Sequence, residues 1–227
     1  MAARDYGQYD GVSTALELVG ERWALLIVRD LLVGPRRYTD LKAGLPRVPT
    51  NILSTRLREL QDAGIIRRAP LAHRGVVYEL TAHGLRLESA VLALARFGAA
   101  SLGEPSVDDI VTGDSLTIAL RAAYRPDAAT GLPSTTWVVR LPSVALGVGV
   151  FAGELVIAPL PGSSATPAIG GIDPTASGVG LDFSTDHRIH DLMADRLSPH
   201  DALASGAVTV LEGDPALLER FARVFCV

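Results

Sequence analysis

A pair of helices joined by a tight turn, in the first third of the chain, does most to limit its possible folds. Residues 38–44 predict a two-turn helix, and the segment Pro46-Arg-Val-Pro49 predicts a turn. Residues 50–63 then predict a longer amphipathic helix, which Gly64 ends. A short helix, a turn and a second helix make a helix-turn-helix arrangement.

The segments around this pair complete a known order of elements. Residues 12–20 predict a one-faced helix, and residues 23–32, apolar on nearly every side, predict a buried helix. After the pair come two short strands, residues 65–69 and 76–81, joined by a basic loop, and then a helix over residues 82–102. This order is that of a winged helix.

Three segments carry a family resemblance: LELVGERWALLIVRDLLVGPRRY at residues 16–38, LSTRLRELQDAGII at residues 53–66 and YELTAHG at residues 78–84. They resemble, in the same order, the HxlR family of winged-helix transcriptional regulators, over about residues 10–100. Many members have a cysteine shortly before the first helix, a redox sensor in some of them. Asp10 stands at that place here, so we do not expect thiol-based sensing.

The resemblance implies a sequence-specific regulator of transcription, with repression as the predicted mode. The family binds double-stranded DNA as a homodimer, which implies contacts through the first helix and the helix at residues 82–102. Two recognition helices would then address half-sites about 34 Å apart on a near-palindromic operator. The alternative is a lipid-binding or protein-interaction protein whose winged helix serves protein contacts.

The helix over residues 50–63 is the predicted DNA-reading element. At 100° per residue, Leu53, Leu57 and Leu60 share one face, and small polar side chains lie on the opposite face. Asparagine can bond adenine through two hydrogen bonds, and serine and threonine can bond several base edges. Arginine and histidine would meet phosphates instead. The predicted DNA contacts are Arg36, Arg37, Thr50, Asn51, Ser54, Thr55, Arg58, His73 and Arg74.

Two alternatives apply to these residues. The polar side chains can be merely solvent-facing groups on a core helix, and Arg56 can support the fold through a salt bridge. The positive charge of this region also has two explanations. Residues 36–74 hold nine basic against three acidic residues, which favours a polyanion site. Yet 20 of the 21 basic residues are arginine, so an arginine-rich solvated surface explains the run equally well.

The second half of the chain is acidic, with 7 basic against 15 acidic residues over residues 104–227, and we do not expect it to touch DNA. Its sequence predicts a mixture of helices and strands. In chain order these are a helix over residues 106–125, strands over 135–141, 144–150, 154–160 and 179–184, helices over 188–197 and 199–206, a strand over 208–212 and a helix over 214–225. Residues 162–174 predict a loop.

Two segments of this half, residues 181–206 and 208–221, resemble the sterol-carrier-protein-like lipid-binding fold, which has an α/β architecture around an apolar cavity. The expected fold class is therefore α+β, with a winged helix-turn-helix domain over residues 1–103 and a sterol-carrier-like domain over residues 104–227. The resemblance implies an apolar small-molecule effector. Predicted ligand contacts are Trp137, Phe151, Phe183 and Met193, with the alternative that these side chains simply fill the core.

Other kinds of site find little support. The single cysteine, Cys226, excludes an intramolecular disulfide and a multi-cysteine metal site, and it indicates a reducing compartment. No secretory signal or membrane-spanning stretch is predicted, so we expect a cytoplasmic protein. His187, His190 and His200 with two nearby aspartates could hold zinc, but capping and solvation are the favoured roles, so no metal or other cofactor is predicted.

No catalytic set stands out either, and we do not expect an enzyme. The nucleophile-elbow and phosphate-loop motifs are absent. Gly147-Val-Gly-Val-Phe-Ala152 fits the dinucleotide-binding pattern, which is meaningful only where a helix follows. Because the next residues are β-rich and broken by prolines, we interpret this segment as strand and turn, with glycines that allow close packing.

Overall fold

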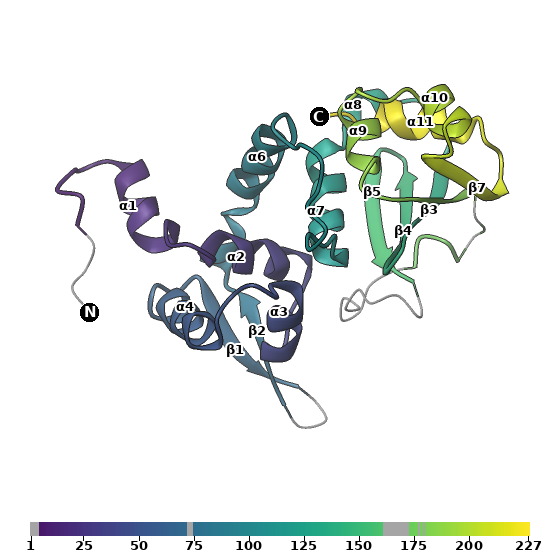
Figure 1. The fold of residues 1–227 in the computed structure, drawn as a ribbon. Helices are drawn as coiled ribbons and strands as arrows, with labels where there is room; N and C mark the ends of the chain where they lie inside the picture. The colour runs from purple at the N-terminus through teal and green to yellow at the C-terminus, as the bar shows by residue number, and fades with distance from the viewer. Residues whose placement is uncertain (1–4, 72–74, 161–172, 177, 179) are drawn as a thin grey trace. The chain divides into compact units, whose positions relative to one another are not determined.

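The computed structural model describes residues 5–71, 75–160, 173–176, 178 and 180–227. The chain divides into two compact units, Met1–Val91 and Leu92–Val227, each of which has its own sheet (Figure 1). Both units mix helices and strands, so the α+β class is confirmed. The predicted domain boundary at residue 103 and the sterol-carrier-like identity of the second unit stay predictions.

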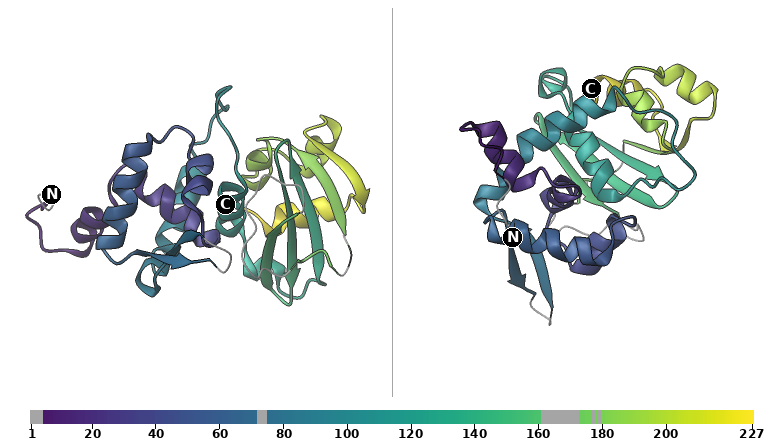
Figure 2. Two further views of the ribbon diagram at one scale, coloured as in Figure 1. Left: turned by 90° about the horizontal axis from the view of Figure 1, so that it is seen from below. Right: turned by 60° about the vertical axis from the view of Figure 1, so that its left-hand side comes forward.

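The N-terminal unit has the predicted winged-helix order. Strands β1 and β2 form an antiparallel hairpin that projects away from helices α3 and α4 (Figures 1 and 2). Its elements are α1 (Gly11–Val19), α2 (Ala24–Val33), α3 (Tyr38–Gly44), α4 (Thr50–Asp62), β1 (Ile66–Pro70), β2 (Val76–Leu80), α5 (Ala82–Leu85) and the start of α6 (Glu88–Ala99).

The core of this unit forms where apolar helix faces meet. Helix α2 buries Ile27 and Val28, as its nearly continuous apolar sequence predicts. Helix α4 buries Leu53, Leu57 and Leu60, each at most 2% exposed, so the predicted core face of this helix is confirmed. Burial of this face orients the opposite side of α4 outward.

Two predicted helices are shorter than the sequence suggested. The helix expected over residues 82–102 is divided into α5 and α6, because Leu87 donates to the carbonyl of Gly84 in a tight turn. The helix expected over residues 106–125 is α7 (Gly113–Ala123). Its start is fixed by a capping box, in which Thr112 and Ser115 each accept the other's backbone N–H in their side chains.

The C-terminal unit is built on a five-stranded sheet with strand order β5-β4-β3-β6-β7. Strands β3 and β6 are parallel, and the other neighbours are antiparallel. The remaining elements are α7, α8 (Pro126–Ala129), β3 (Thr135–Leu141), β4 (Val144–Phe151), β5 (Glu154–Pro159), β6 (Leu181–Thr185), α9 (Ile189–Met193), α10 (Pro199–Ala204), β7 (Val208–Gly213) and α11 (Leu217–Val224).

One face of this sheet carries the main core. Alternate residues of β3, among them Trp137 and Val139, pack with side chains from α7 to α11, and α11 crosses this face (Figure 2). On the other face, a Cβ added to Gly147 would come within 2.9 Å of Thr175, and one added to Gly149 within 2.9 Å of Pro174. The interpretation of these glycines as close-packing residues is confirmed, and strand β5 rather than a helix follows them.

None of the helices in the part of the chain that the structure describes has the length and apolar character needed to cross a membrane.

Candidate nucleic-acid interface

Helix α4 presents a polar face to solvent in the N-terminal unit. Thr50, Asn51, Ser54 and Arg58 are exposed, and Thr55 is half-buried. These are the residues that the sequence assigned to DNA contact on this helix. They lie on the side of α4 that its buried leucines leave free.

Two of the three hydroxyl side chains of this face, those of Ser54 and Thr55, are already engaged as donors. Ser54 Oγ donates to the carbonyl oxygen of Thr50 at 3.0 Å, and Thr55 Oγ1 donates to that of Asn51 at 2.9 Å. Each oxygen keeps its lone pairs for a partner outside the helix. In this conformation the two hydroxyls are therefore suited to accept from the amino groups of adenine or cytosine.

The prediction that Arg36 contacts DNA is wrong for this structure. Arg36 is only 1% exposed, and its Nη1 donates to the carbonyl of Pro35 at 3.0 Å. Its backbone bridges to Tyr78 of β2, with N···O distances of 3.0 and 2.8 Å, so that this segment acts as a third strand beside the hairpin. A side chain that points inward from this strand has no access to a phosphate.

Arg37 differs from its neighbour because successive side chains on an extended segment point to opposite sides. It is exposed, and a Cβ added to Gly75 would lie 3.9 Å from its Cζ atom. The Arg37 guanidinium thus lies beside the wing. The predicted wing contacts His73 and Arg74 fall outside the residues that the structure describes.

Arg56 has the structural role that the sequence left open. Its Nη2 lies 2.8 Å from Glu21 Oε2, and its Nη1 pairs with Glu59 on the next turn of α4. The side chain is 10% exposed. Arg56 therefore ties α4 to the segment between α1 and α2, and the salt-bridge alternative is confirmed.

Other residues around this surface are not marked by any sequence motif. Arg47 and Arg68 are exposed, and only the charge count included them. No motif pointed to Tyr38, whose Oη donates to the carbonyl of Thr50 at 3.0 Å. The four-residue spacing of Tyr38 and Lys42, which places both on one face of α3, was the available signal.

Helix α1 is held by its N-cap residue, Asp10. The carboxylate accepts from the backbone N–H groups of Val12 and Ser13 at 2.7 and 3.0 Å, and from the Ser13 hydroxyl. These hydrogen bonds, the hydroxyl's first, hold the pKa of Asp10 below its ordinary value. Asp10 therefore has a capping role at the start of α1.

In the C-terminal unit, the predicted ligand residues are mostly core residues. Trp137, Phe183 and Met193 are at most 2% exposed, and Trp137 Nε1 donates to the carbonyl of Leu217 at 3.0 Å. The ring of Phe221 lies 5.8 Å from that of Trp137 and 5.4 Å from that of Phe183. Phe151 is half-buried at the end of β4.

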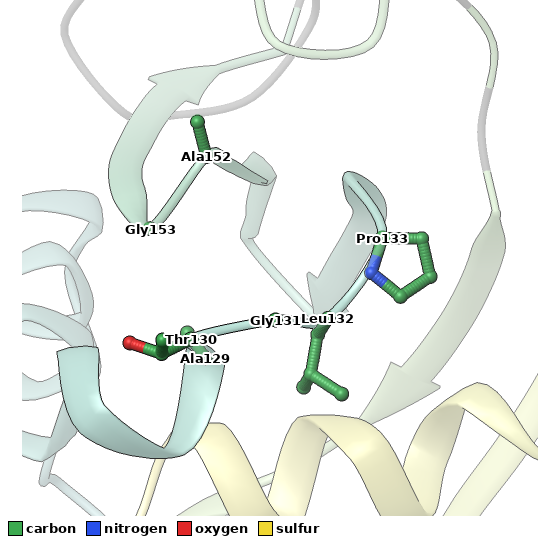
Figure 3. A pocket seen from close by; sticks show the side chains of 7 residues that line it. All are labelled: Ala129, Thr130, Gly131, Leu132, Pro133, Ala152 and Gly153. Carbon is green, nitrogen blue, oxygen red and sulfur yellow. The ribbon is translucent and has the colours of Figure 1, made fainter.

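A pocket of about 500 Å³ lies elsewhere in this unit, between the loop after α8 and the β4–β5 turn (Figure 3). Tyr124 Oη donates to the carbonyl of Gly153 at 2.5 Å beside it, and burial raises the pKa of this phenol. None of the four predicted ligand residues lines the pocket, whose walls are Ala129, Thr130, Gly131, Leu132, Pro133, Ala152 and Gly153.

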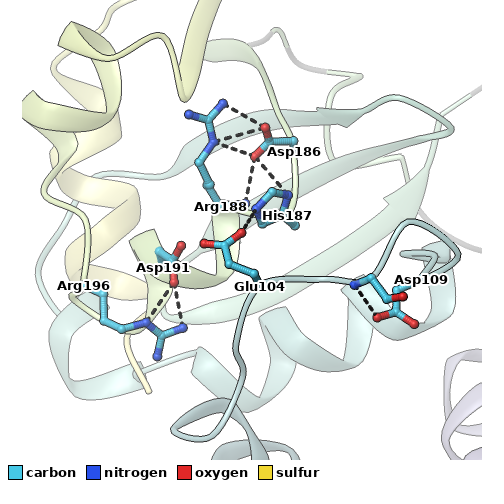
Figure 4. A network of polar contacts seen from close by, with 8 residues as sticks. Glu104, Asp109, Asp186, His187, Arg188, Asp191 and Arg196 are labelled. Atoms are coloured by element: carbon cyan, nitrogen blue, oxygen red, sulfur yellow. Dashed lines mark hydrogen bonds and ion pairs between the residues drawn. The ribbon is translucent and has the colours of Figure 1, made fainter.

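Three of the residues considered for zinc, Asp186, His187 and Asp191, are engaged with other side chains (Figure 4). Asp186 pairs with Arg188 and Asp191 with Arg196, each at 2.8 Å, and His187 lies 3.4 Å from Glu104. The hydrogen bonds from Arg188 lower the pKa of Asp186, whereas burial lowers that of His190. Over the described ranges, no three such side chains are placed to share a metal ion.

Together, the hairpin, the buried face of α4 and its exposed polar face define a winged helix-turn-helix protein. The pattern of the HxlR-like helix-turn-helix family matches residues 18–105. An HTH-type transcriptional regulator of Synechocystis is 32% identical over 106 residues, which are 45% of this chain and 78% of the relative. The chain belongs to the HxlR family.

A second relative matches a similar share of this chain. An HTH-type transcriptional regulator of Mycobacterium bovis is 40% identical over 98 residues, or 42% of this chain. The chain thus spans 61% of the length of that relative. The reduced form of the transcriptional regulator YodB from Bacillus subtilis is a solved structure 31% identical to this chain, covering 44% of this chain and 98% of its own, with a TM-score of 0.37.

Proposed function

We propose that this chain is a cytoplasmic, sequence-specific DNA-binding regulator of transcription, with repression as its mode. The observation that carries the proposal is the exposed polar face of α4, with Asn51, Ser54 and Arg58 opposite a fully buried apolar face. Such a helix can enter the major groove with its first turns against base edges. The relatives that match the same segment are HTH-type transcriptional regulators.

A selection from random duplexes tests this function and does not require a known operator sequence. The full chain should enrich a near-palindromic sequence whose half-sites are about 34 Å apart, as two recognition helices related by a twofold axis require. Enrichment of no motif would favour the alternative that the winged helix serves protein contacts.

We propose a homodimer built on α1 and α6, since both helices carry exposed apolar side chains. Val12 and Leu16 on α1 are 70% and 44% exposed, and Leu94 and Phe97 on α6 are 51% and 79% exposed. A large exposed aromatic side chain next to other apolar groups is typical of an interaction surface. A second copy of the chain is the occupant that a twofold-symmetric operator would require.

Replacing Phe97 with glutamate should therefore convert the dimer to a monomer, because a charge would be buried at the centre of the interface. Size-exclusion chromatography with light scattering should give twice the 23.9 kDa chain mass for the wild type and one chain mass for Phe97→Glu. Leu211→Glu is the matched control, since Leu211 is 54% exposed on β7. A Phe97→Glu dimer would contradict this interface.

For the C-terminal unit we propose binding of an apolar effector at the pocket of Figure 3, in line with the resemblance to the sterol-carrier-like fold. Its volume of about 500 Å³ falls within the ordinary range for small-molecule sites. To change operator affinity tenfold, the effector must discriminate two states of the dimer by about 1.4 kcal/mol.

A thermal-shift screen of fatty acids, sterols and polyketide-like compounds measures this binding. A ligand at 100 times its Kd should stabilise the protein by about 2.7 kcal/mol. If no compound stabilises the chain, the C-terminal unit is better explained as a scaffold for dimerisation or partner binding.

A further inference from the structure

Two side chains of α3 bind the backbone where the chain turns into α4. Lys42 Nζ donates to the carbonyl oxygens of Pro46 and Val48, both at 2.8 Å. Tyr38, one helical turn earlier, donates from Oη to the carbonyl of Thr50 at 3.0 Å. Three alternate carbonyl groups at the start of α4 are therefore held by one face of one short helix.

The carbonyl group of Val48 needs such a donor. Val48 is fully buried, and a buried carbonyl oxygen without a hydrogen-bond partner is destabilising by about 1–3 kcal/mol. Prolines at 46 and 49 remove two backbone N–H groups from the same turn. The side chain of Lys42 supplies donors that the backbone of this turn lacks.

Lys42 is also the only lysine in the chain, in which every other basic residue is arginine apart from the histidines. An ammonium group is compact and carries three donors that rotate freely, so it can reach two carbonyls on a tight turn. Arginine offers its donors in a rigid planar fork. The need to reach both carbonyls is a physical reason for lysine at this position.

Tyr38 connects these contacts to the exposed polar face of α4, the proposed DNA-contacting surface. Its Oη lies 3.4 Å from Ser54 Oγ, and Ser54 Oγ itself donates to the Thr50 carbonyl at 3.0 Å. Tyr38 and Ser54 therefore converge on one acceptor in the first turn of α4. A shift of Tyr38 would change the position of a side chain that faces solvent at the proposed DNA surface.

We propose that Lys42 and Tyr38 are positioning residues that fix the first turn of α4 for base contact, and that Lys42 does so without contacting DNA itself. This inference rests on the proposed DNA-binding function. Its physical basis is that base contacts depend on placing α4 to within a fraction of an ångström, whereas phosphate contacts tolerate small displacements.

The test compares Lys42→Met with wild type on the selected operator and on a scrambled duplex, by fluorescence anisotropy over a salt series. Lys42→Met should weaken operator binding tenfold or more, and leave scrambled-duplex binding and the salt slope unchanged. Lys42→Arg should restore part of the loss. Arg58→Met is the matched control: it should weaken both duplexes and reduce the salt slope by about 0.9.

A second readout needs no DNA. Val48 N–H donates to the Leu45 carbonyl at 3.1 Å and Leu53 N–H donates to the Pro49 carbonyl at 2.9 Å, so both amides report on the turn. Their hydrogen exchange in the full chain should be faster in Lys42→Met and unchanged in Arg58→Met. If Lys42→Met fails to fold, Tyr38→Phe, which removes only the hydroxyl, should give the same pattern more weakly.

Three results would distinguish a positioning role of Lys42 from a phosphate contact and from failure of the proposed DNA-binding function. Equal weakening on both duplexes, with a shallower salt slope, would make Lys42 a phosphate contact and overturn the inference. Unchanged exchange at Val48 and Leu53 would also overturn it. If the wild type prefers no duplex, the proposed function fails, while the exchange measurement still decides whether Lys42 orders the start of α4.

Discussion

Replacing Asn51 with alanine should weaken binding to the operator by about 5- to 150-fold and leave binding to a scrambled duplex unchanged. Asn51 is exposed on the first turn of α4, where an amide can donate to and accept from one adenine. Loss of one such paired contact removes about 1–3 kcal/mol of discrimination between bases. Fluorescence anisotropy at one fixed salt concentration measures both affinities.

Arg58→Ala is the control for this prediction. Arg58 is exposed two turns further along α4 and is assigned to a phosphate. Its loss should weaken both duplexes by a similar factor and make the salt dependence shallower. An Asn51→Ala protein that keeps full operator affinity, or loses affinity equally for both duplexes, would contradict base reading by α4.

Replacing Phe221 with alanine should lower the free energy of unfolding of the C-terminal unit by about 3–5 kcal/mol. Phe221 is fully buried, and its ring contacts three others, with centroid distances of 5.8 Å to Trp137, 5.4 Å to Phe183 and 4.7 Å to Phe225. Because these rings hold one another in place, they cannot move far enough to fill the cavity that alanine would leave. Urea denaturation followed by near-ultraviolet circular dichroism gives the value.

Leu211→Ala serves as the surface control, since a side chain 54% exposed on an edge strand should change stability by less than about 0.5 kcal/mol. The comparison also tests the assignment of Trp137, Phe183 and Met193 to the core. A loss below about 1 kcal/mol for Phe221→Ala would mean that the interior is loosely filled, as in a ligand cavity. The larger loss would identify these residues as core.

The helix-turn-helix was predictable because its signals are local. Residues 38–44 and 50–63 match the observed helices α3 and α4 to within a residue, since prolines and a glycine bound them. Strand β3 was likewise predicted at its observed limits, because Thr135–Leu141 is rich in β-branched and aromatic residues. Local spacing was enough to orient α4 correctly.

What the sequence missed depends on contacts between distant segments. Arg36 and Arg37 look alike in the sequence, and only the bridge to Tyr78 turns one inward and the other outward. Similarly, no pattern distinguishes a core tryptophan from one that lines a pocket. For Trp137 the ring contacts from Phe221 and Phe225, far along the chain, settle its place in the core.

The residues of the candidate site also fall into these two groups: those predictable from local spacing and those that depend on contacts in the folded unit. The exposed residues of α4 followed from helical periodicity, whereas Lys42 and Tyr38 act on backbone carbonyl groups that carry no sequence signature. The sequence left a salt bridge open for Arg56, but its partner Glu21 lies outside the helix and became visible only in the folded unit.

Fluorescence anisotropy of the full chain on the DNA upstream of its own gene, repeated across a salt series, is the most direct test of DNA-binding regulation. The account predicts saturable binding about a thousandfold or more tighter than to a scrambled duplex, a preference that persists as salt rises. Weak binding, equal on both duplexes and lost as salt rises, would contradict it, since only non-specific attraction to phosphates would remain.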